Sequence, residues 1–376
     1  MARNTFKRSD AASLHGYGRL AADATIGVTD AVESLHRAIA RLPGPTRSIS
    51  SFVYASIRAG ASLAGRGMDA VLALATPRIA AAQATSRQAT LRSALNGVYG
   101  DHLAATGNPL AIPMRLRRNG QPLTLTRTAL AAAMPDAGGR VLVLVHGLCT
   151  NDLQWCRNGH DHGAVLARDL GYTPIYLHYN SGRSITSNAR EFATLLELLT
   201  AQWPVRLEEL TILGHSMGGL LARGAVEAAR AGRHRWLKRL RRLVFLGTPH
   251  HGALLEQLGS WVESALHVSA YSAPFARLGA ARSAGITDLR HGSVAPLPAG
   301  IECYAIAATL GEHARPARDQ LIGDGLVPLD SALGRHRQPS RSLAFPPERQ
   351  WIARHTSHLD LLSRVEVCEQ LRKWLA

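Results

Sequence analysis

Short apolar runs that alternate with helix-like segments set the strongest limit on how this 376-residue chain can fold. VLVLV (141–145) is apolar throughout, as expected of a parallel strand that is covered on both faces. Four more strand-like runs follow it: TPIYLHY (173–179), LTILG (210–214), LVFLG (243–247) and IECYAIA (301–307). This alternation predicts an α/β fold, in which a mostly parallel sheet has helices on both faces.

Helix-like segments separate and follow these runs. They lie near 161–170, over 187–203, where the apolar residues have helical spacing, and over 360–375. Ahead of the first run, Asn119 and Gly120 stand between two extended stretches within 114–126, which predicts a β-hairpin. We therefore expect one α/β domain over residues 106–376.

The chain before this domain has a different character. Apolar residues recur at helical spacing over 28–39 and again over 53–75, and LPGPT (42–46) interrupts them. We expect a helical N-terminal region over 1–105. Its helices either form a subdomain packed on the main one or lie as a pair in a membrane interface.

The charge of the chain is strongly positive, at +16, and arginine carries most of it. The arginines are scattered and aromatics make up only 5% of residues, so the sequence shows no base-stacking surface and we expect no nucleic acid partner. The densest basic stretch, RHRWLKRLRR (233–242), is either a solvated connection or a phosphate-binding patch. Peripheral membrane contact stays open.

Cysteine usage and the N-terminus favour a cytoplasmic protein with reduced thiols. Cys149, Cys156, Cys303 and Cys368 form no CxxC pair, although a disulfide between the first two is conceivable. The N-terminus shows no secretory signal pattern, and no stretch reaches 18 uncharged apolar residues.

The run LTILG continues into GHSMGG (214–219), a Gly-x-Ser-x-Gly pattern between a predicted strand and a predicted helix. Such a turn is sharp, so the residues flanking the serine must be small. Here they are Gly214 and Gly218, with His215 between Gly214 and Ser216. The pattern predicts a nucleophile elbow, whose tight turn lifts the hydroxyl of the nucleophile Ser216 above the sheet. An ordinary turn serine is the alternative for any isolated match.

A serine nucleophile needs a histidine base, and the histidine needs a carboxylate that fixes its tautomer. In this kind of sheet the order along the chain is Ser, then Asp or Glu, then His. Asp324 lies in a glycine-rich loop after a predicted strand, and Asp330 is a second choice. Of His355 and His358, we choose His358 because it directly precedes the last helical run.

Two backbone N–H groups are candidates for an oxyanion hole. Met217 is the residue after the nucleophile, at the start of a helix. The second donor should come from the loop after an earlier strand, and the Leu148 N–H is placed for it because Gly147 lets the backbone turn. His146 is then a structural residue of that loop.

The assembled pattern resembles the α/β-hydrolase superfamily, and more narrowly bacterial lipases and the hydrolase domain of GPI inositol-deacylases. The resemblance extends from about residue 110 to 376 and rests on VHGLC, YNSG, GHSMGG, GTPHHGA, GDGLVP and SHLDLL, in that order. It implies an α/β-hydrolase fold with Ser216, Asp324 and His358 as the catalytic triad and Leu148 and Met217 as oxyanion donors. It implies no cofactor, and a structural role for His250.

Two further segments carry weaker expectations. The stretch 254–300 lies where such enzymes place a cap over the active site, so it is either a lid that admits lipid or a plain insertion. In HDH (160–162) two histidines stand two residues apart at a predicted helix start. We expect their side chains to diverge, so we predict no metal site.

The sequence thus predicts a serine hydrolase that cleaves carboxylic esters of small molecules or lipids through an acyl-enzyme on Ser216. An acyltransferase, a thioesterase or a polyester depolymerase would use the same triad, because pocket shape and water access decide the acceptor. A non-catalytic membrane-binding protein on a hydrolase scaffold is the alternative from another class.

Overall fold

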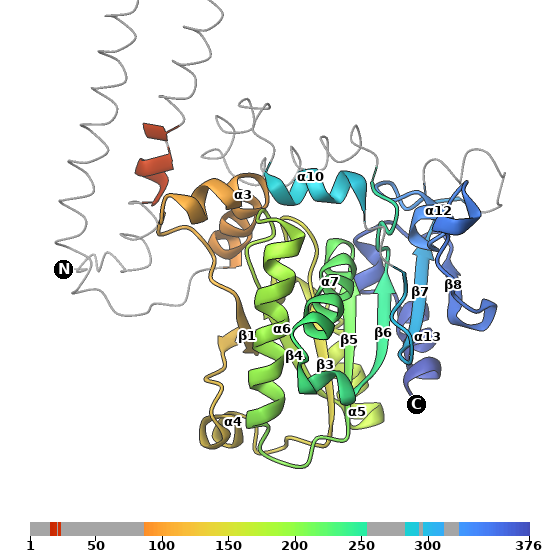
Figure 1. Cartoon of the computed structure of the whole chain (residues 1–376), viewed down its shortest axis with the longest axis horizontal. Coiled ribbons are helices and arrows are strands. Elements are labelled where there is room, and N and C mark those ends of the chain that lie inside the picture. Colours follow the sequence, from red (N-terminus) through yellow and green to blue (C-terminus); the bar gives the residue numbers. More distant parts are fainter. Residues whose placement is uncertain (1–15, 21, 24–85, 254–282, 293–295, 312–322) are drawn as a thin grey trace, which may run out of the picture. The chain divides into compact units, whose positions relative to one another are not determined.

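The computed structural model describes residues 16–20, 22–23, 86–253, 283–292, 296–311 and 323–376 (Figure 1). The predicted helices over 28–39 and 53–75, and the start of the predicted cap over 254–282, lie outside the described residues. Among the described residues, no helix combines the length and the apolar character that crossing a bilayer requires.

Contacts divide the chain into two compact units. In the described part, the first holds residues 16–20, 22–23, 86–92 and 102–111. Arg92 organises it by donating hydrogen bonds to the carbonyl oxygens of Pro109, Leu110 and Ala111. Helix α3 (Ser86–Ala105) runs through both units, because its middle part, residues 93–101, belongs to the second. The predicted domain boundary at residue 105 stays a prediction.

The second unit is built on one eight-stranded sheet with the order β2-β1-β4-β3-β5-β6-β7-β8. Strands β1 and β2 pair antiparallel, β1 pairs antiparallel with β4, and the other neighbours are parallel. The strands are β1 (Arg115–Arg118), β2 (Gln121–Pro122), β3 (Arg140–Val145), β4 (Thr173–His178), β5 (Glu209–His215), β6 (Leu240–Leu246), β7 (Glu302–Ala308) and β8 (Gln350–Ala353). The predicted mostly parallel sheet is confirmed.

Helices cover both faces of this sheet (Figure 1). Besides α3 they are α4 (Arg127–Ala133), α5 (His162–Leu170), α6 (Ile185–Gln202), α7 (Met217–Ala231), α10 (Ala284–His291), α12 (Leu329–Ala332) and α13 (Val365–Leu375). Short 3₁₀ turns are η2 (Asp152–Trp155), η3 (Arg235–Lys238), η4 (Pro339–Arg341), η5 (Pro347–Arg349) and η6 (Asp360–Leu362). Helices α6 and α7 pack together on one face, and α5 and α13 contact each other on the other face.

Successive side chains of a parallel strand point to opposite faces of the sheet, so each strand contributes to the core on both faces. Leu142 and Leu144 of β3 join Leu166 of α5 and Leu371 of α13 in one core cluster. All of these side chains are buried. Because the intervening residues of β3 are buried too, the whole run VLVLV is apolar.

Two local predictions can be compared with the structure. The hairpin at Asn119 and Gly120 is confirmed: both residues have positive φ, and β1 pairs with β2 across them. The single helix predicted over 360–375 is wrong. Residues 360–362 form η6, Arg364 is extended (φ −69°, ψ 130°), and only α13 is α-helical. The short strand β8 and the helix α4 were not predicted.

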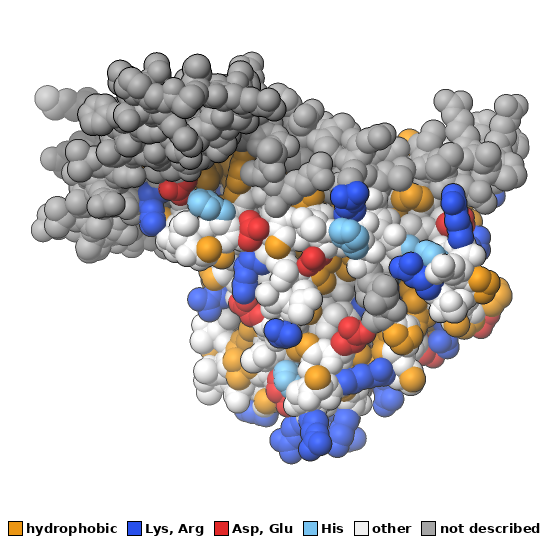
Figure 2. All heavy atoms as spheres, turned by 45° about the horizontal axis from the view of Figure 1, so that its top comes forward, with side chains coloured by type: hydrophobic (Ala, Val, Ile, Leu, Met, Phe, Trp, Pro, Cys, Tyr) orange, Lys and Arg blue, Asp and Glu red, His pale blue; other side chains and the backbone are white. Residues whose placement is uncertain are grey.

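The basic stretch 233–242 forms the connection from α7 to β6. Arg233, Arg235, Lys238, Arg239 and Arg241 are exposed, whereas Trp236 is fully buried and anchors the segment. Figure 2 shows Lys and Arg side chains spread over the described surface, with a group at its lower end.

Candidate active site

Ser216 occupies a strained turn between β5 and α7. Its backbone has φ 55° and ψ −126°, a conformation that L residues rarely adopt. The Ser216 N–H donates to the carbonyl oxygen of Leu246 at the end of β6, with 2.8 Å between nitrogen and oxygen. The turn therefore sits at the carboxyl edge of the sheet, with its serine directly ahead of the N-terminus of α7.

The glycines around Ser216 are required by close packing. A Cβ atom on Gly214 would lie 2.6 Å from the Gly219 nitrogen, and one on Gly218 would lie 2.3 Å from the Val145 carbonyl oxygen. Both separations are shorter than atoms tolerate. The pattern Gly-x-Ser-x-Gly thus reflects a tight strand-turn-helix unit, the local structure of an α/β-hydrolase elbow.

His358 and Asp324 form a buried pair. His358 Nδ1 lies 2.7 Å from Asp324 Oδ2, and the two residues are 4% and 2% exposed. Because a buried carboxylate accepts here, Nδ1 carries the hydrogen and Nε2 keeps a lone pair. This is the tautomer that a general base requires.

The Asp324 carboxylate is fixed on its other side as well. Its Oδ1 accepts hydrogen bonds from the N–H groups of Leu326 (3.0 Å) and Val327 (2.8 Å). The His358 N–H donates to the Asp324 carbonyl oxygen at 3.0 Å. The Leu326 and Val327 donors hold the carboxylate in one orientation, and the His358 N–H ties the two backbones together; none of these three donors was predicted.

The alternative candidates lie apart from this pair. Asp330 belongs to α12, where its carbonyl oxygen accepts from the Arg335 N–H. His355 is exposed, with φ 49°. The structure therefore pairs Asp324 with His358.

His215 supports the loop that carries His358 through a hydrogen bond to its backbone. Its Nε2 lies 3.0 Å from the His358 carbonyl oxygen, which only accepts, so Nε2–H is the donor. The two imidazole centroids are 4.7 Å apart. Burial first, and then the neighbouring His358, lower the pKa of His215 well below its usual value, so this imidazole is neutral. His215 thus supports the loop without adding a charge.

The peptide between Gly147 and Leu148 is oriented by its own loop. The Gly147 carbonyl oxygen accepts from His146 Nδ1 (2.8 Å) and from the Thr150 hydroxyl (2.9 Å). In a trans peptide the N–H points opposite to the C=O, so the Leu148 N–H is directed away from these two donors. A Cβ on Gly147 would lie 2.9 Å from the Ser216 Cβ, so this loop packs directly on the serine.

His146 itself is a buried, neutral residue. Burial, and then the nearby His178, lower its pKa to about 3. Its Nε2 accepts from the Tyr179 N–H at 3.4 Å, and its ring stacks on the Tyr179 ring at 4.3 Å between centroids. Both ring nitrogens are therefore engaged in holding the loop.

A neighbouring residue, Ser181, extends this support. Its Oγ accepts a hydrogen bond from the Cys149 N–H at 3.0 Å. Cys149 has φ 59°, so the loop needs such an anchor where it turns. Ser181 belongs to YNSG, and a side chain that stabilises the candidate oxyanion loop was not foreseen from that motif.

Ser216, His358 and Leu148 line one cavity. The rest of its wall is apolar and comes from Pro249, Ala253, Leu289, Leu326 and Val327. Leu289 belongs to α10, which lies in the segment predicted as a cap. Met217, the first residue of α7, is fully buried, and the first N–H groups of a helix have no partner within it.

His250 lies next to this cavity but not in its wall. It is fully buried between Phe245 and Phe345, and Arg223 Nη1 donates to its Nδ1 at 3.0 Å. Burial and the Arg223 charge lower its pKa well below the usual value. These contacts suit a residue that packs the loop after β6.

The cysteines and the histidine pair of HDH can also be compared with the structure, and the histidine expectation changes. All four cysteines are free, so Cys149 and Cys156 form no disulfide. The expectation that His160 and His162 diverge is wrong, because His160 Nε2 lies 2.8 Å from His162 Nδ1. Only His162 belongs to α5. His160 precedes the helix in a tight turn, so the angular spacing of a helix does not separate the two rings.

Comparisons with known proteins give distant likenesses. A family model described as a domain of unknown function (DUF7379) matches residues 115–286. No curated protein matches the sequence. Among solved structures, the Bacillus licheniformis lipase BlEst2 in mature form is 16% identical, with 63% of this chain and 92% of that chain covered and a TM-score of 0.43. RedJ, a thioesterase from the prodiginine biosynthetic pathway in Streptomyces coelicolor, is 16% identical over 64% of this chain and 86% of that chain, with a TM-score of 0.41. The mostly parallel eight-stranded sheet with helices on both faces and the elbow at Ser216 are those of an α/β-hydrolase fold.

Proposed function

We propose that this chain is a serine hydrolase that cleaves carboxylic esters through a covalent acyl-enzyme on Ser216. The observation that carries the proposal is the strained elbow at Ser216 in one cavity with His358, whose Nδ1 is held by the buried Asp324. An unactivated serine hydroxyl is a poor nucleophile, and this arrangement supplies the base that it lacks.

In the proposed reaction His358 Nε2 takes the Ser216 proton as Oγ attacks the ester carbonyl carbon. The N–H groups of Leu148 and Met217 stabilise the oxyanion, and His358 then protonates the leaving alcohol. A water molecule that gives its proton to His358 attacks the acyl-enzyme, and the acid leaves as Oγ regains a proton. Asp324 keeps the His358 tautomer throughout.

The apolar lining around Ser216 supports a substrate with an apolar acyl part. Six of its eight lining residues are apolar, and the polar ones are Ser216 and His358. The resemblance of the motifs to lipases and GPI inositol-deacylases agrees with an acyl ester of a lipid. We propose lipid esters as the substrate class on these grounds, with membrane contact through residues 1–105 as a further part of the proposal.

The test combines labelling with turnover. A fluorophosphonate should label the wild type and leave Ser216→Ala unlabelled, and p-nitrophenyl esters of graded chain length should reveal the preferred acyl part. A folded wild type that neither reacts with the probe nor hydrolyses any ester would overturn the proposal.

The same assay separates the alternative acceptors. Thioester substrates, polyester films and competing alcohols, analysed by product, would identify a thioesterase, a depolymerase or an acyltransferase. Flotation of the full chain with anionic vesicles tests membrane contact, and absent or salt-insensitive binding would remove it.

A further inference from the structure

A cluster of three potential metal ligands lies apart from the Ser216 cavity. The ligand atoms of His160, His162 and Cys368 all lie within 4.8 Å of one another. They come from three separate elements: the turn before α5, the first residue of α5, and the middle of α13. The ester chemistry uses none of them.

The backbone fixes both histidines. Arg157 and His160 exchange two N–H to carbonyl hydrogen bonds of 2.9 Å around Asn158 and Gly159, both with positive φ, which is a tight hairpin turn. Asp161 then caps α5 by accepting the Ala164 N–H at 3.2 Å. His160 and His162 are therefore presented on rigid backbone on either side of that cap.

The hydrogen bonds of His162 leave one nitrogen for a ligand. His162 Nε2 lies 2.9 Å from the Leu361 carbonyl oxygen, so Nε2 carries the hydrogen and Nδ1 has the lone pair. A backbone carbonyl on the outer nitrogen is the usual partner of a metal-bound imidazole.

We propose that His160, His162 and Cys368 form a binding site for one Zn²⁺ ion. Two imidazoles and a thiolate are ligands that zinc prefers, and a water molecule would complete a tetrahedron. Zn–N bonds of about 2.0–2.1 Å and Zn–S bonds of about 2.3 Å place tetrahedral ligand atoms roughly 3.3–3.6 Å apart. The histidine pair at 2.8 Å must open slightly, and the widest pair must close by about 1 Å, which side-chain rotation provides.

Proton balance follows from the groups present. Zinc binds the thiolate form of cysteine, so the Cys368 thiol must give up its proton when the metal binds. Binding releases this proton to solvent. Because His162 Nδ1 has a lone pair, His160 Nε2 carries the hydrogen of their contact, and this hydrogen moves to His160 Nδ1 when Nε2 binds the metal. Zinc affinity should therefore fall as the pH falls.

The ion can enter from an open cavity. His160 is part of its wall, together with Cys156, Asp161 and Tyr176. An ion bound there would tie α13 to α5. His162 also donates a hydrogen bond to the carbonyl oxygen of Leu361, three residues after His358. The bound ion would therefore be linked through His162 to the loop that carries His358.

The experiment titrates the full chain with Co²⁺, as a spectroscopic stand-in for zinc, and with Zn²⁺. The wild type should bind one equivalent and show a thiolate-to-cobalt charge-transfer band. Cys368→Ser should lose the band, and His160→Ala should bind at least about 100-fold more weakly, because even outer-shell partners contribute 10–100-fold.

Cys156→Ser is the matched control, since its exposed thiol lines the same cavity and is not a proposed ligand. It should keep both the band and the affinity. A wild type without saturable binding of one ion, or a band that survives in Cys368→Ser, would overturn the proposal. Should Cys368→Ser fail to fold, the partly exposed His160→Ala decides the outcome by its affinity alone.

Discussion

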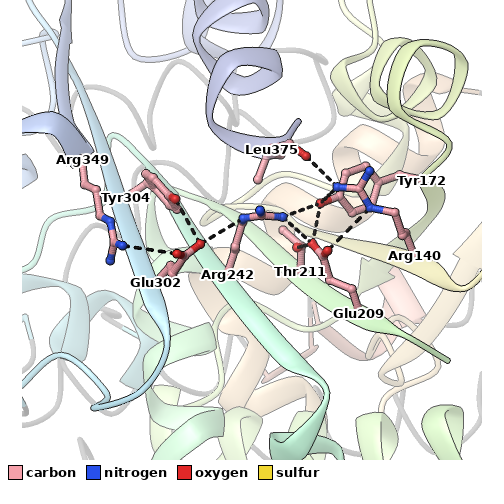
Figure 3. A network of polar contacts seen from close by, with 9 residues as sticks. All are labelled: Arg140, Tyr172, Glu209, Thr211, Arg242, Glu302, Tyr304, Arg349 and Leu375. Carbon is pink, nitrogen blue, oxygen red and sulfur yellow. Dashed lines mark hydrogen bonds and ion pairs between the residues drawn. The ribbon is translucent and has the colours of Figure 1, made fainter.

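The two ends of the central strands of the same sheet carry very different polar groups. At the carboxyl ends, Ser216 and the pair Asp324–His358 are buried in apolar surroundings. At the amino ends, a chain of ion pairs and hydrogen bonds crosses the sheet in the order of its strands (Figure 3). The network contains Arg140, Tyr172, Glu209, Thr211, Arg242, Glu302, Tyr304, Arg349 and the Leu375 carbonyl.

Glu209 and Arg242 are the centre of that network. Arg242 Nη1 lies 2.8 Å from Glu209 Oε1, and Arg242 Nε lies 3.1 Å from Glu302 Oε2. Arg140 Nη2 donates to the carbonyl oxygen of Leu375 at 2.7 Å and so ties the end of α13 to β3. Every charge here has an opposite charge beside it.

Under the proposed function, the carboxyl ends of the strands serve the chemistry, and we expect the amino ends to serve the stability of the fold. At the amino edge, charges neutralise one another and contribute to the free energy of unfolding. At the carboxyl edge, Ser216 is held in a strained turn. Asp324 orients the His358 ring through Nδ1, which leaves the lone pair of Nε2 available for a proton. Substitutions at the two edges should therefore change different measured quantities.

The largest effect on turnover is expected from Ser216→Ala. Losing Oγ removes the nucleophile, so kcat/KM for a p-nitrophenyl ester should fall by about 10⁴-fold or more. The denaturation midpoint should stay near that of the wild type, because alanine keeps the Cβ and the same strained φ. Substantial remaining turnover would show that Ser216 is not the nucleophile.

Asp324→Asn should lower kcat by about 10³–10⁴-fold with a small change in KM. The amide can donate to His358 Nδ1, which places the hydrogen on Nε2 and removes the base. Asp330→Asn is the control, since this acid lies six positions further on in α12, and it should keep wild-type turnover. Equal losses in the two variants would contradict the pairing of Asp324 with His358.

Glu209→Ala should act in the opposite way. The substitution leaves Arg242 and Tyr172 without their shared acceptor, and the free energy of unfolding should fall by about 2 kcal/mol. Turnover per folded molecule should not change, because the network lies at the amino ends of the strands and Ser216 lies at their carboxyl ends. Urea unfolding and kcat measured on one preparation test both statements, and a large loss of kcat would break the separation of the two edges.

The stabilisation by Glu209 should depend on pH. Burial raises the pKa of Glu209, but hydrogen bonds from Tyr172 and Thr211 and the charges of Arg242 and Arg140 lower it below its usual value overall. A depressed carboxyl pKa adds stability above the unfolded pKa of about 4.3, and this stability is lost as the pH falls through the folded pKa. The difference in unfolding free energy between the wild type and Glu209→Gln should therefore shrink below about pH 4. A difference that grows as the pH falls would be the wrong sign.

The smallest effect is expected from Lys238→Ala. Lys238 is exposed in η3, in the basic connection near the same amino edge. Its loss should change the free energy of unfolding by less than about 0.5 kcal/mol and leave turnover unchanged. A larger change in stability would mean that an exposed charge at this edge contributes as much as the charges of the network do.

Much of the fold follows from local patterns. The apolar runs that became β3, β5 and β6 identify buried parallel strands, because a strand covered on both faces has no polar period. The glycines of GHSMGG identify the elbow, because only small residues allow its strand and helix to meet. The short strand β8 was missed since four mixed residues carry no such period.

The sequence by itself determined the parallel sheet and the elbow at Ser216, because both depend on patterns within a few residues. It also gave the order of the candidate residues along the chain. Only the tertiary structure decided that His358 meets Asp324 rather than Asp330, and that His160 and His162 lie beside Cys368, more than 200 residues further on. The physical reason is that local periodicity fixes which face a side chain occupies. The distance between two side chains far apart in the chain is set by the packing of the elements that carry them.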